Sequence, residues 1–198
     1  YKGSLIESKV GLAVYLPQEG VTNIDGTVKG HSGIATKAGT LNVNESAKIM
    51  ATGASISNEE LAANNSGISA SGDIIFVECH DGYADNVHIN IKAELEKDTD
   101  SNIIRVFKPS NVTKDVKEIK GVYTTAHVEN INGALVTTYN QDEATIKVGN
   151  TNYAEDSLDY ALNLFATGKQ QQAMLLDNIT TTEIIQIISE TPINLTLD

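Results

Sequence analysis

The chain has 198 residues, of which 40% are hydrophobic and 20% are charged, a composition typical of a folded protein rather than a disordered one. The length suits one substantial core, so we expect a single domain over residues 1–198. The net charge of -12 and the presence of a single arginine, Arg105, argue against a nucleic-acid partner, because phosphate contacts need clustered Lys and Arg.

Alternation of apolar and polar residues predicts strands over the first part of the chain. We expect them at residues 4–16, 21–24, 27–29, 34–43 and 47–52. Asp25-Gly26 suits a type I′ hairpin turn between the second and third of these strands. Ser57 is a suitable N-cap for a short helix over residues 57–63, with Glu59 and Glu60 in its first turn.

The stretch from Ser71 to Leu95 is predicted to form the centre of the sheet. A continuous apolar run, Ile74 to Val77, indicates a strand that is covered on both faces. Asp81-Gly82 then marks a tight turn, and the residues from Val87 to Leu95 alternate as in a half-buried strand. Together these features predict an antiparallel hairpin.

Further strands are expected at residues 103–108, 116–130, 134–139 and 144–148. Asn132-Gly133, between the second and third of them, is the strongest hairpin signal in the chain. Roughly 8 to 10 strands at hairpin-like spacing, with no evident internal repeat, predict a mainly β protein. The expected architecture is an antiparallel β-sandwich that resembles a jelly roll.

The hydrophobic period changes near the C-terminus. Asn152-x-x-Glu155 matches a capping box, and apolar residues at helical spacing follow it as far as Gly168. A helical insertion is therefore expected over about residues 153–190. Its last part, after the capping-box pattern Thr180-x-x-Glu183, would also suit a strand. Alternation after Pro192 predicts a final strand over about residues 193–198.

A calcium site is predicted in the loop that follows the central hairpin. Asp98, Asp100 and Asn102 have the spacing that opens a calcium-binding loop. An EF-hand is excluded, because Ile103 stands where the turn glycine belongs and Pro109 stands where the bidentate Glu belongs. The remaining alternatives are an irregular calcium site and a solvated turn, and no other cofactor is expected.

Other candidate sites cluster on the predicted hairpin. Glu78, His80 and His88 should share its outer face, where they would either bind zinc or remain solvent-facing polar residues. Cys79 is the only cysteine, and we expect it to be a buried structural thiol. It forms no dyad with His80, because neighbours on a strand point to opposite faces.

No catalytic constellation is found in the sequence. Ser71-Gly72-Asp73 and His127 are not joined by any motif spacing, and neither a Gly-x-Ser-x-Gly elbow nor a phosphate-binding glycine loop occurs. We therefore expect a protein that is not an enzyme. No apolar run approaches the roughly 20 residues of a membrane-spanning helix, so no membrane span is expected.

Sequons for N-glycosylation are slightly more frequent than the roughly three that chance would give in a chain rich in Asn, Ser and Thr. Glycosylation is expected only if the protein is exported. The sequons lie at Asn44, Asn64, Asn111, Asn178 and Asn194.

Two stretches resemble the TasA/camelysin family of exported β-sandwich filament proteins. Ala38-Gly39-Thr40-Leu41-Asn42-Val43 is similar to an early strand of that family. Gly72-Asp73, with its following strand, Asp81-Gly82 and second strand, is similar to a hairpin of the family. The resemblance implies a jelly-roll-like sandwich and assembly by strand exchange, and it assigns no catalytic residue.

The sequence thus predicts an extracellular or cell-surface structural subunit that forms a homo-polymer: a filament, a pilus-like fibre or a surface layer. A terminal strand, from residues 4–16 or 193–197, would fill an open sheet edge of the next subunit. One alternative is a secreted monomeric β-sandwich module that binds calcium or carbohydrate, although the absence of Trp disfavours sugar binding. Another is a structural protein of a virion or its tail.

Overall fold

The computed structural model describes residues 3–64, 71–97, 100–170 and 172–179. Its contacts divide the chain into two compact units. The first comprises residues 1–124 and 129–140, and the second comprises residues 125–128 and 141–198. Strands predominate over helices among the described residues, which confirms the prediction of a mainly β protein.

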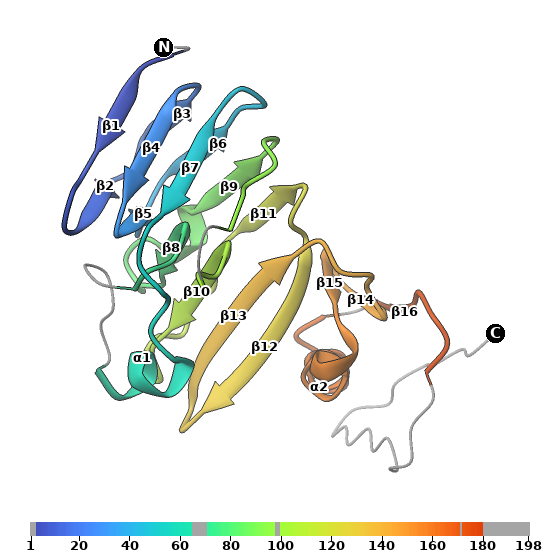
Figure 1. The fold of residues 1–198 in the computed structure, drawn as a ribbon. Coiled ribbons are helices and arrows are strands. Elements are labelled where there is room, and N and C mark those ends of the chain that lie inside the picture. Colours follow the sequence, from blue (N-terminus) through green and yellow to red (C-terminus); the bar gives the residue numbers. More distant parts are fainter. Residues whose placement is uncertain (1–2, 65–70, 98–99, 171, 180–198) are drawn as a thin grey trace. The chain divides into compact units, whose positions relative to one another are not determined.

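The first unit is a β-solenoid, in which the chain winds through three sheets in successive coils (Figure 1). Every full coil contributes one strand to sheet A, then one to sheet B, then one to sheet C. The first coil holds β1 (Leu5–Glu7), β2 (Leu12–Leu16) and β3 (Val21–Ile24), and the second holds β4 (Thr27–Gly30), β5 (Ser32–Thr36) and β6 (Thr40–Val43). The third holds β7 (Lys48–Ala51), β8 (Ile75–Glu78) and β9 (His88–Ile91), and β10 (Ile104–Lys108) and β11 (Glu118–Gly121) extend sheets B and C.

The coils stack in parallel register. Val14 pairs with Ile34, Ile34 with Ile75, and Ile75 with Ile104, so chemically similar residues lie above one another. Paired residues of the first two coils are about 20 positions apart, as expected for one solenoid repeat. Two insertions lengthen the third coil: residues 52–74, which carry α1 (Asn58–Asn64), and residues 79–87, which carry η1 (Ala84–Asn86).

The core lies inside the coils, where the inward-facing residues of β4 to β10 are buried. Ile34, Ile75 and Ile104 from sheet B meet Leu41 and Ile89 from sheet C in one cluster. Alternation arises here because one face of each strand meets this core and the other faces outward.

The outer face of sheet B is covered as well. Leu61 of α1 packs in a second cluster with Phe76 and Phe107, and all three are fully buried. The prediction that the apolar run from Ile74 to Val77 is covered on both faces is therefore confirmed. The N-cap prediction is also confirmed, because the backbone N–H of Glu60 donates to Ser57 Oγ at 3.1 Å.

An antiparallel strand follows the solenoid in the first unit. β13 (Ala134–Asn140) pairs with β10, and it follows the last residues of β12 (Thr125–Ile131). Asn132 and Gly133 adopt φ angles of 52° and 88° between these strands. A type I′ turn needs positive φ at both central residues, so the predicted turn is confirmed.

The second unit is smaller. Its part of β12 pairs with β15 (Thr151–Tyr153), which pairs with β14 (Ile146–Val148), and β14 in turn pairs with β16 (Ala173–Leu175). After η2 (Glu155–Ser157), α2 (Leu158–Ala166) forms as predicted and buries an apolar face. The helical prediction is wrong at Ala173–Leu175, which form a strand, and residues 180–198, with the predicted final strand, lie outside the described part.

The predicted strand pairing needs correction. Sheets A and C are parallel, so the antiparallel jelly roll is not confirmed. The central hairpin prediction is wrong, because β8 pairs with β5 and β10 in sheet B whereas β9 pairs with β6 and β11 in sheet C. The expectation of no internal repeat also fails, since the coils are structural repeats.

The remaining differences between the predicted and the observed strands lie at the corners of the solenoid, where the chain passes from one sheet to the next. Asp25-Gly26 joins β3 in sheet C to β4 in sheet A, so it is not a hairpin turn. The predicted strand over residues 34–43 is split at Gly39, whose φ is +79°. A Cβ at Gly39 would lie 2.6 Å from the carbonyl oxygen of Gly20, so the corner needs glycine. Residues 4–16 are likewise divided into β1 and β2.

Candidate functional site

The outer face of sheet C carries polar side chains in rows that run across its strands. Because the strands are parallel and in register, equivalent positions of successive coils lie side by side. The central row consists of Asn23, Asn42, Asn90 and Lys120. The adjacent row, just beyond the strand ends, begins with Asp25, Asn44 and Lys92.

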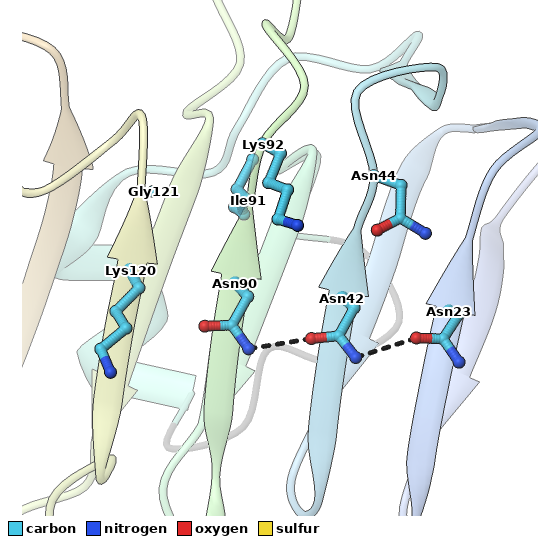
Figure 2. Close-up of a pocket in the computed structure, with 8 residues that line it drawn as sticks. All are labelled: Asn23, Asn42, Asn44, Asn90, Ile91, Lys92, Lys120 and Gly121. Carbon is cyan, nitrogen blue, oxygen red and sulfur yellow. Dashed lines mark hydrogen bonds between the residues drawn. The ribbon is translucent and has the colours of Figure 1, made fainter.

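Hydrogen bonds join the amides of the central row into a ladder (Figure 2). Asn42 Nδ2 donates to Asn23 Oδ1 at 2.9 Å, and Asn90 Nδ2 donates to Asn42 Oδ1 at 2.8 Å. In the adjacent row, Asn44 Nδ2 donates to Asp25 Oδ1 at 2.8 Å. Strands of a sheet are about 4.8 Å apart, a spacing that lets one amide reach the next.

A groove of about 450 Å³ opens over these rows. Gly121 lines it with φ +112°, and a Cβ at this position would meet the Ile91 carbonyl oxygen at 1.7 Å. A side chain at residue 121 is therefore excluded, because the backbone of Ile91 already occupies the place of its Cβ. The groove is lined by Asn23, Asn42, Asn44, Asn90, Ile91, Lys92, Lys120 and Gly121.

The groove contains hydrogen-bond donors that the ladder leaves unused. Each Asn amide nitrogen has two N–H groups, and the ladder occupies only one of those on Asn42, Asn44 and Asn90. Lys92 is exposed, and its ammonium forms no ion pair within the described part of the chain. Lys120 Nζ lies 2.6 Å from Glu118 Oε1, and this hydrogen bond lowers the pKa of Glu118.

A second notable surface is the free edge of the first coil, formed by β1, β2 and β3. Each of these strands ends its sheet in the described structure and so has a strand neighbour on one side only. The first coil holds five of the nine large apolar side chains that are exposed among the described residues: Leu5 and Ile6 on β1, Val10 between β1 and β2, Tyr15 on β2 and Val21 on β3.

Arg105 and Asp73 form a buried ion pair beneath the insertion of residues 52–74. Both side chains are fully buried, and Arg105 Nη2 lies 2.9 Å from Asp73 Oδ2. Burial raises the pKa of Asp73, although the Arg105 guanidinium and a hydrogen bond from Ser55 act against that rise. The only arginine of the chain is therefore structural and is not exposed to a ligand.

The predicted calcium ligands are only partly described. Asp98 lies outside the described residues, and Asp100 is exposed. Asn102 instead supports the buried ion pair, with Nδ2 3.3 Å from Asp73 Oδ1. Among the described residues no group of three or more His, Cys, Asp or Glu side chains could hold a metal ion. The calcium site stays a prediction.

The residues expected to share one hairpin face do not meet. Glu78, in sheet B, is buried and binds Lys37 Nζ at 2.9 Å. His80 is exposed and stacks on Tyr83, whereas His88, in sheet C, lies 3.7 Å from Glu118. The zinc hypothesis depended on the hairpin, so it fails with it.

Cys79 is buried, as predicted for a structural thiol, and burial raises its pKa to about 12.

His127 belongs to a polar cluster in the second unit. Its Nδ1 lies 2.7 Å from Asp156 Oδ2, and its Nε2 lies 3.2 Å from Asp142 Oδ2. The neighbouring hydroxyl, that of Ser157, is buried and is already engaged with Asp156 and the backbone N–H of Val128. This arrangement fixes the imidazole but presents no accessible nucleophile.

The predicted sequons occupy different environments. Asn64, Asn111 and Asn178 are exposed, whereas the amide of Asn44 is hydrogen-bonded in the rows of sheet C. Asn194 lies outside the described residues. Glycosylation stays a prediction for all of them.

Sequence reasoning missed both the amide ladder and the free edge. A signal for the ladder is present: Asn23, Asn42 and Asn90 are each followed by a buried β-branched residue. Comparisons with protein families, curated proteins and solved structures found no match, so the TasA/camelysin resemblance stays a prediction. Within the described residues, no helix has the length and apolar character needed to cross a membrane.

Proposed function

We propose that this protein is an extracellular structural subunit that self-associates through the free edge of its first coil into a filament or surface layer. The observation that carries the proposal is the concentration of exposed apolar side chains in the first coil, on β1, β2 and β3 and on the turn between β1 and β2. Unpaired strand edges readily pair with another chain, and proteins that remain monomeric blunt them with charges or cover them. Here Val10 is 92% exposed and Val21 is 68% exposed.

The mode of association differs from the strand exchange expected from the sequence. Residues 4–16 form β1 and β2, which are already paired with β4 and β5 of the same chain. Association therefore adds an edge to an edge and withdraws no strand from its own sheet. Backbone hydrogen bonds would give the contact its direction, and burial of the apolar rim would stabilise it by about 25 cal/mol per Å². The alternative donor, residues 193–197, stays a prediction.

The kind of contact decides the kind of assembly. If the first coil met the first coil of a second copy, the contact would be self-complementary and would close a dimer. A polymer needs the first coil to meet a different edge of the next copy. β11 provides such an edge, because it ends sheet C in the described structure. We assign this head-to-tail pairing to the proposed polymer.

Light scattering and negative-stain electron microscopy of the purified protein test the proposal. Unmodified protein is expected to form regular polymers, and a Val10→Lys/Val21→Lys double variant is expected to remain near 21.2 kDa. The matched control, Tyr83→Lys/Met174→Lys, also replaces two exposed apolar residues, but away from the first coil. An unmodified protein that is monomeric, or a control that depolymerises equally, would overturn the proposal.

A further inference from the structure

We propose that the groove on the outer face of sheet C binds an acidic oligosaccharide, with Lys92 and Lys120 holding a sugar carboxylate and the amide rows holding hydroxyl groups. The groove shares strands β3 and β11 with the proposed polymer contact, but it opens on the outer face of sheet C, and its proposed role does not depend on self-association. The inference rests on the N–H groups that the ladder leaves unused, on the exposed ammonium of Lys92, and on the groove that opens over both.

The chemistry of the lining selects an anion with many acceptors. Asn23 and Asn42 accept ladder bonds through Oδ1, while N–H groups of the row remain available. Lys92 adds an ammonium that has no anionic partner in the described structure. A carboxylate accepts hydrogen bonds without donating any, and its bonds to an ammonium are roughly twice as strong as neutral ones.

The local charges show how a carboxylate would be accommodated. Asp25 lies at the far edge of the rows, where it accepts a hydrogen bond from Asn44. Glu118 holds Lys120, so a ligand carboxylate would share or displace that partner. Lys92 is therefore the first anchor, and Lys120 is the second. Both are exposed, and each can reach a ligand without removing a buried group from the fold.

The shape of the site favours a saccharide over an acidic peptide. A bound peptide usually needs apolar pockets for its side chains or an unpaired strand edge, and the groove opens on the face of sheet C rather than along one of its edges. Its only large apolar lining residue is the buried Ile91. Amides repeated at the strand spacing instead match a ligand with hydroxyl groups along its length. The lining contains no aromatic ring, so a neutral sugar would lack a stacking surface.

NMR titration of the full chain with a glucuronate-containing tetrasaccharide tests the assignment. We expect chemical-shift changes at Asn42, Asn90 and Lys92, and binding that weakens as salt is added. The methyl ester of the same tetrasaccharide, which lacks only the negative charge, is the matched ligand control. Lys92→Gln is expected to weaken binding about tenfold or more, because it removes a charge-assisted hydrogen bond.

Lys48→Gln is the matched protein control, since it removes one exposed lysine from β7 in sheet A. Its affinity should equal that of the unmodified protein. The proposal is overturned if the shifts lie elsewhere, if the ester binds equally well, or if Lys48→Gln weakens binding as much as Lys92→Gln. Tighter binding of a poly-glutamate peptide at the same residues would overturn the saccharide assignment.

Discussion

Replacing Arg105 with Met should destabilise the solenoid strongly. The Arg105 side chain is fully buried and donates in several directions at once. Its Nε lies 2.9 Å from Asp73 Oδ2, and its Nη1 lies 2.7 Å from the carbonyl oxygen of Ile56 and 3.0 Å from Asn58 Oδ1. Its Nη2 also lies 3.2 Å from the carbonyl oxygen of Ser71. The guanidinium of Arg105, on β10, thus forms hydrogen bonds with both ends of the insertion of residues 52–74.

The size of this loss in stability follows from the unpaired, buried carboxylate of Asp73 that Arg105→Met would leave. Removing one partner of a buried ion pair leaves an uncompensated charge and costs about 3–5 kcal/mol. Typical domains have a free energy of unfolding of about 5–15 kcal/mol, so the loss is a large part of the total. Arg105→Lys should recover little of it, because an ammonium cannot reproduce the planar fork that reaches Asp73, Ile56 and Asn58 together.

Urea unfolding followed by circular dichroism measures the effect. With a slope of about 2 kcal/mol per M, the midpoint should fall by about 2 M. An Arg105→Met/Asp73→Leu double variant should be more stable than Arg105→Met alone, because no buried charge remains.

The stability of Arg105→Met should also depend on pH, in a direction that follows from the pKa of Asp73. Loss of Arg105 should raise the pKa of Asp73 further, so the folded state would bind a proton more tightly than the unfolded state does. The stability of Arg105→Met should therefore increase as the pH falls from 7 toward 5. A loss below about 1 kcal/mol, or stability that decreases over this pH range, would refute the reasoning.

Three smaller effects should also be measurable. The Cys79 thiol, with its pKa of about 12, should resist iodoacetamide at pH 8 in the native protein and react fully in urea, as mass spectrometry would show. Asn42→Ala removes two ladder bonds and should cost about 1–2 kcal/mol in urea unfolding, whereas an unchanged midpoint would contradict a stabilising ladder. Backbone N–H groups of Thr113 and Lys114 lower the pKa of Asp81. Asp81 therefore stabilises the fold above about pH 4 and loses this effect as the pH falls through its folded pKa, so an acid titration of Asp81→Asn should show a smaller loss.

Elements that depend on neighbouring residues could be predicted from the sequence. The cap at Ser57, the turn at Asn132-Gly133 and the helix before Gly168 all follow from side chains within one or two turns of the chain. Their geometry is decided locally, by a hydroxyl that reaches a nearby N–H or by residues that accept a positive φ. Tertiary packing did not override them.

Strand pairing could not be predicted in the same way. The run from Ile74 to Val77 and the alternation from Val87 to Leu95 are the same in a sandwich hairpin and in a solenoid, since either fold can bury a strand on both faces or on one. What differs is the partner of each strand. Ile75 pairs with Ile34 and Ile104 in other coils, and no local signal in the chain links them.

The insertions hid the repeat that would have revealed the solenoid. Asn23 and Asn42 are separated by one short coil, but the third coil contains α1 and η1 before Asn90. The pairing of Arg105 with Asp73 is equally non-local, across 32 positions. Such contacts form when the coils stack, so the face of sheet C that carries the amide rows is a product of the tertiary fold.

The two proposed surfaces share strands but use different groups, since the polymer contact uses strand edges and apolar side chains whereas the groove uses the outward polar side chains of sheet C. The apolar edge belongs to β1, β2 and β3, whereas Lys92 follows β9 and Lys120 lies on β11, in later coils. The amide rows connect them, and both rows donate toward the first coil, from Asn90 to Asn42 to Asn23 and from Asn44 to Asp25. A copy whose β11 paired with β3 would therefore extend the central row and bring its own Lys120 to the side of Asn23. Polymerisation should lengthen the groove but leave Lys92, its first cationic anchor, between β6 and β11 of the same copy, so blocking the edge and blocking Lys92 should affect different measurements.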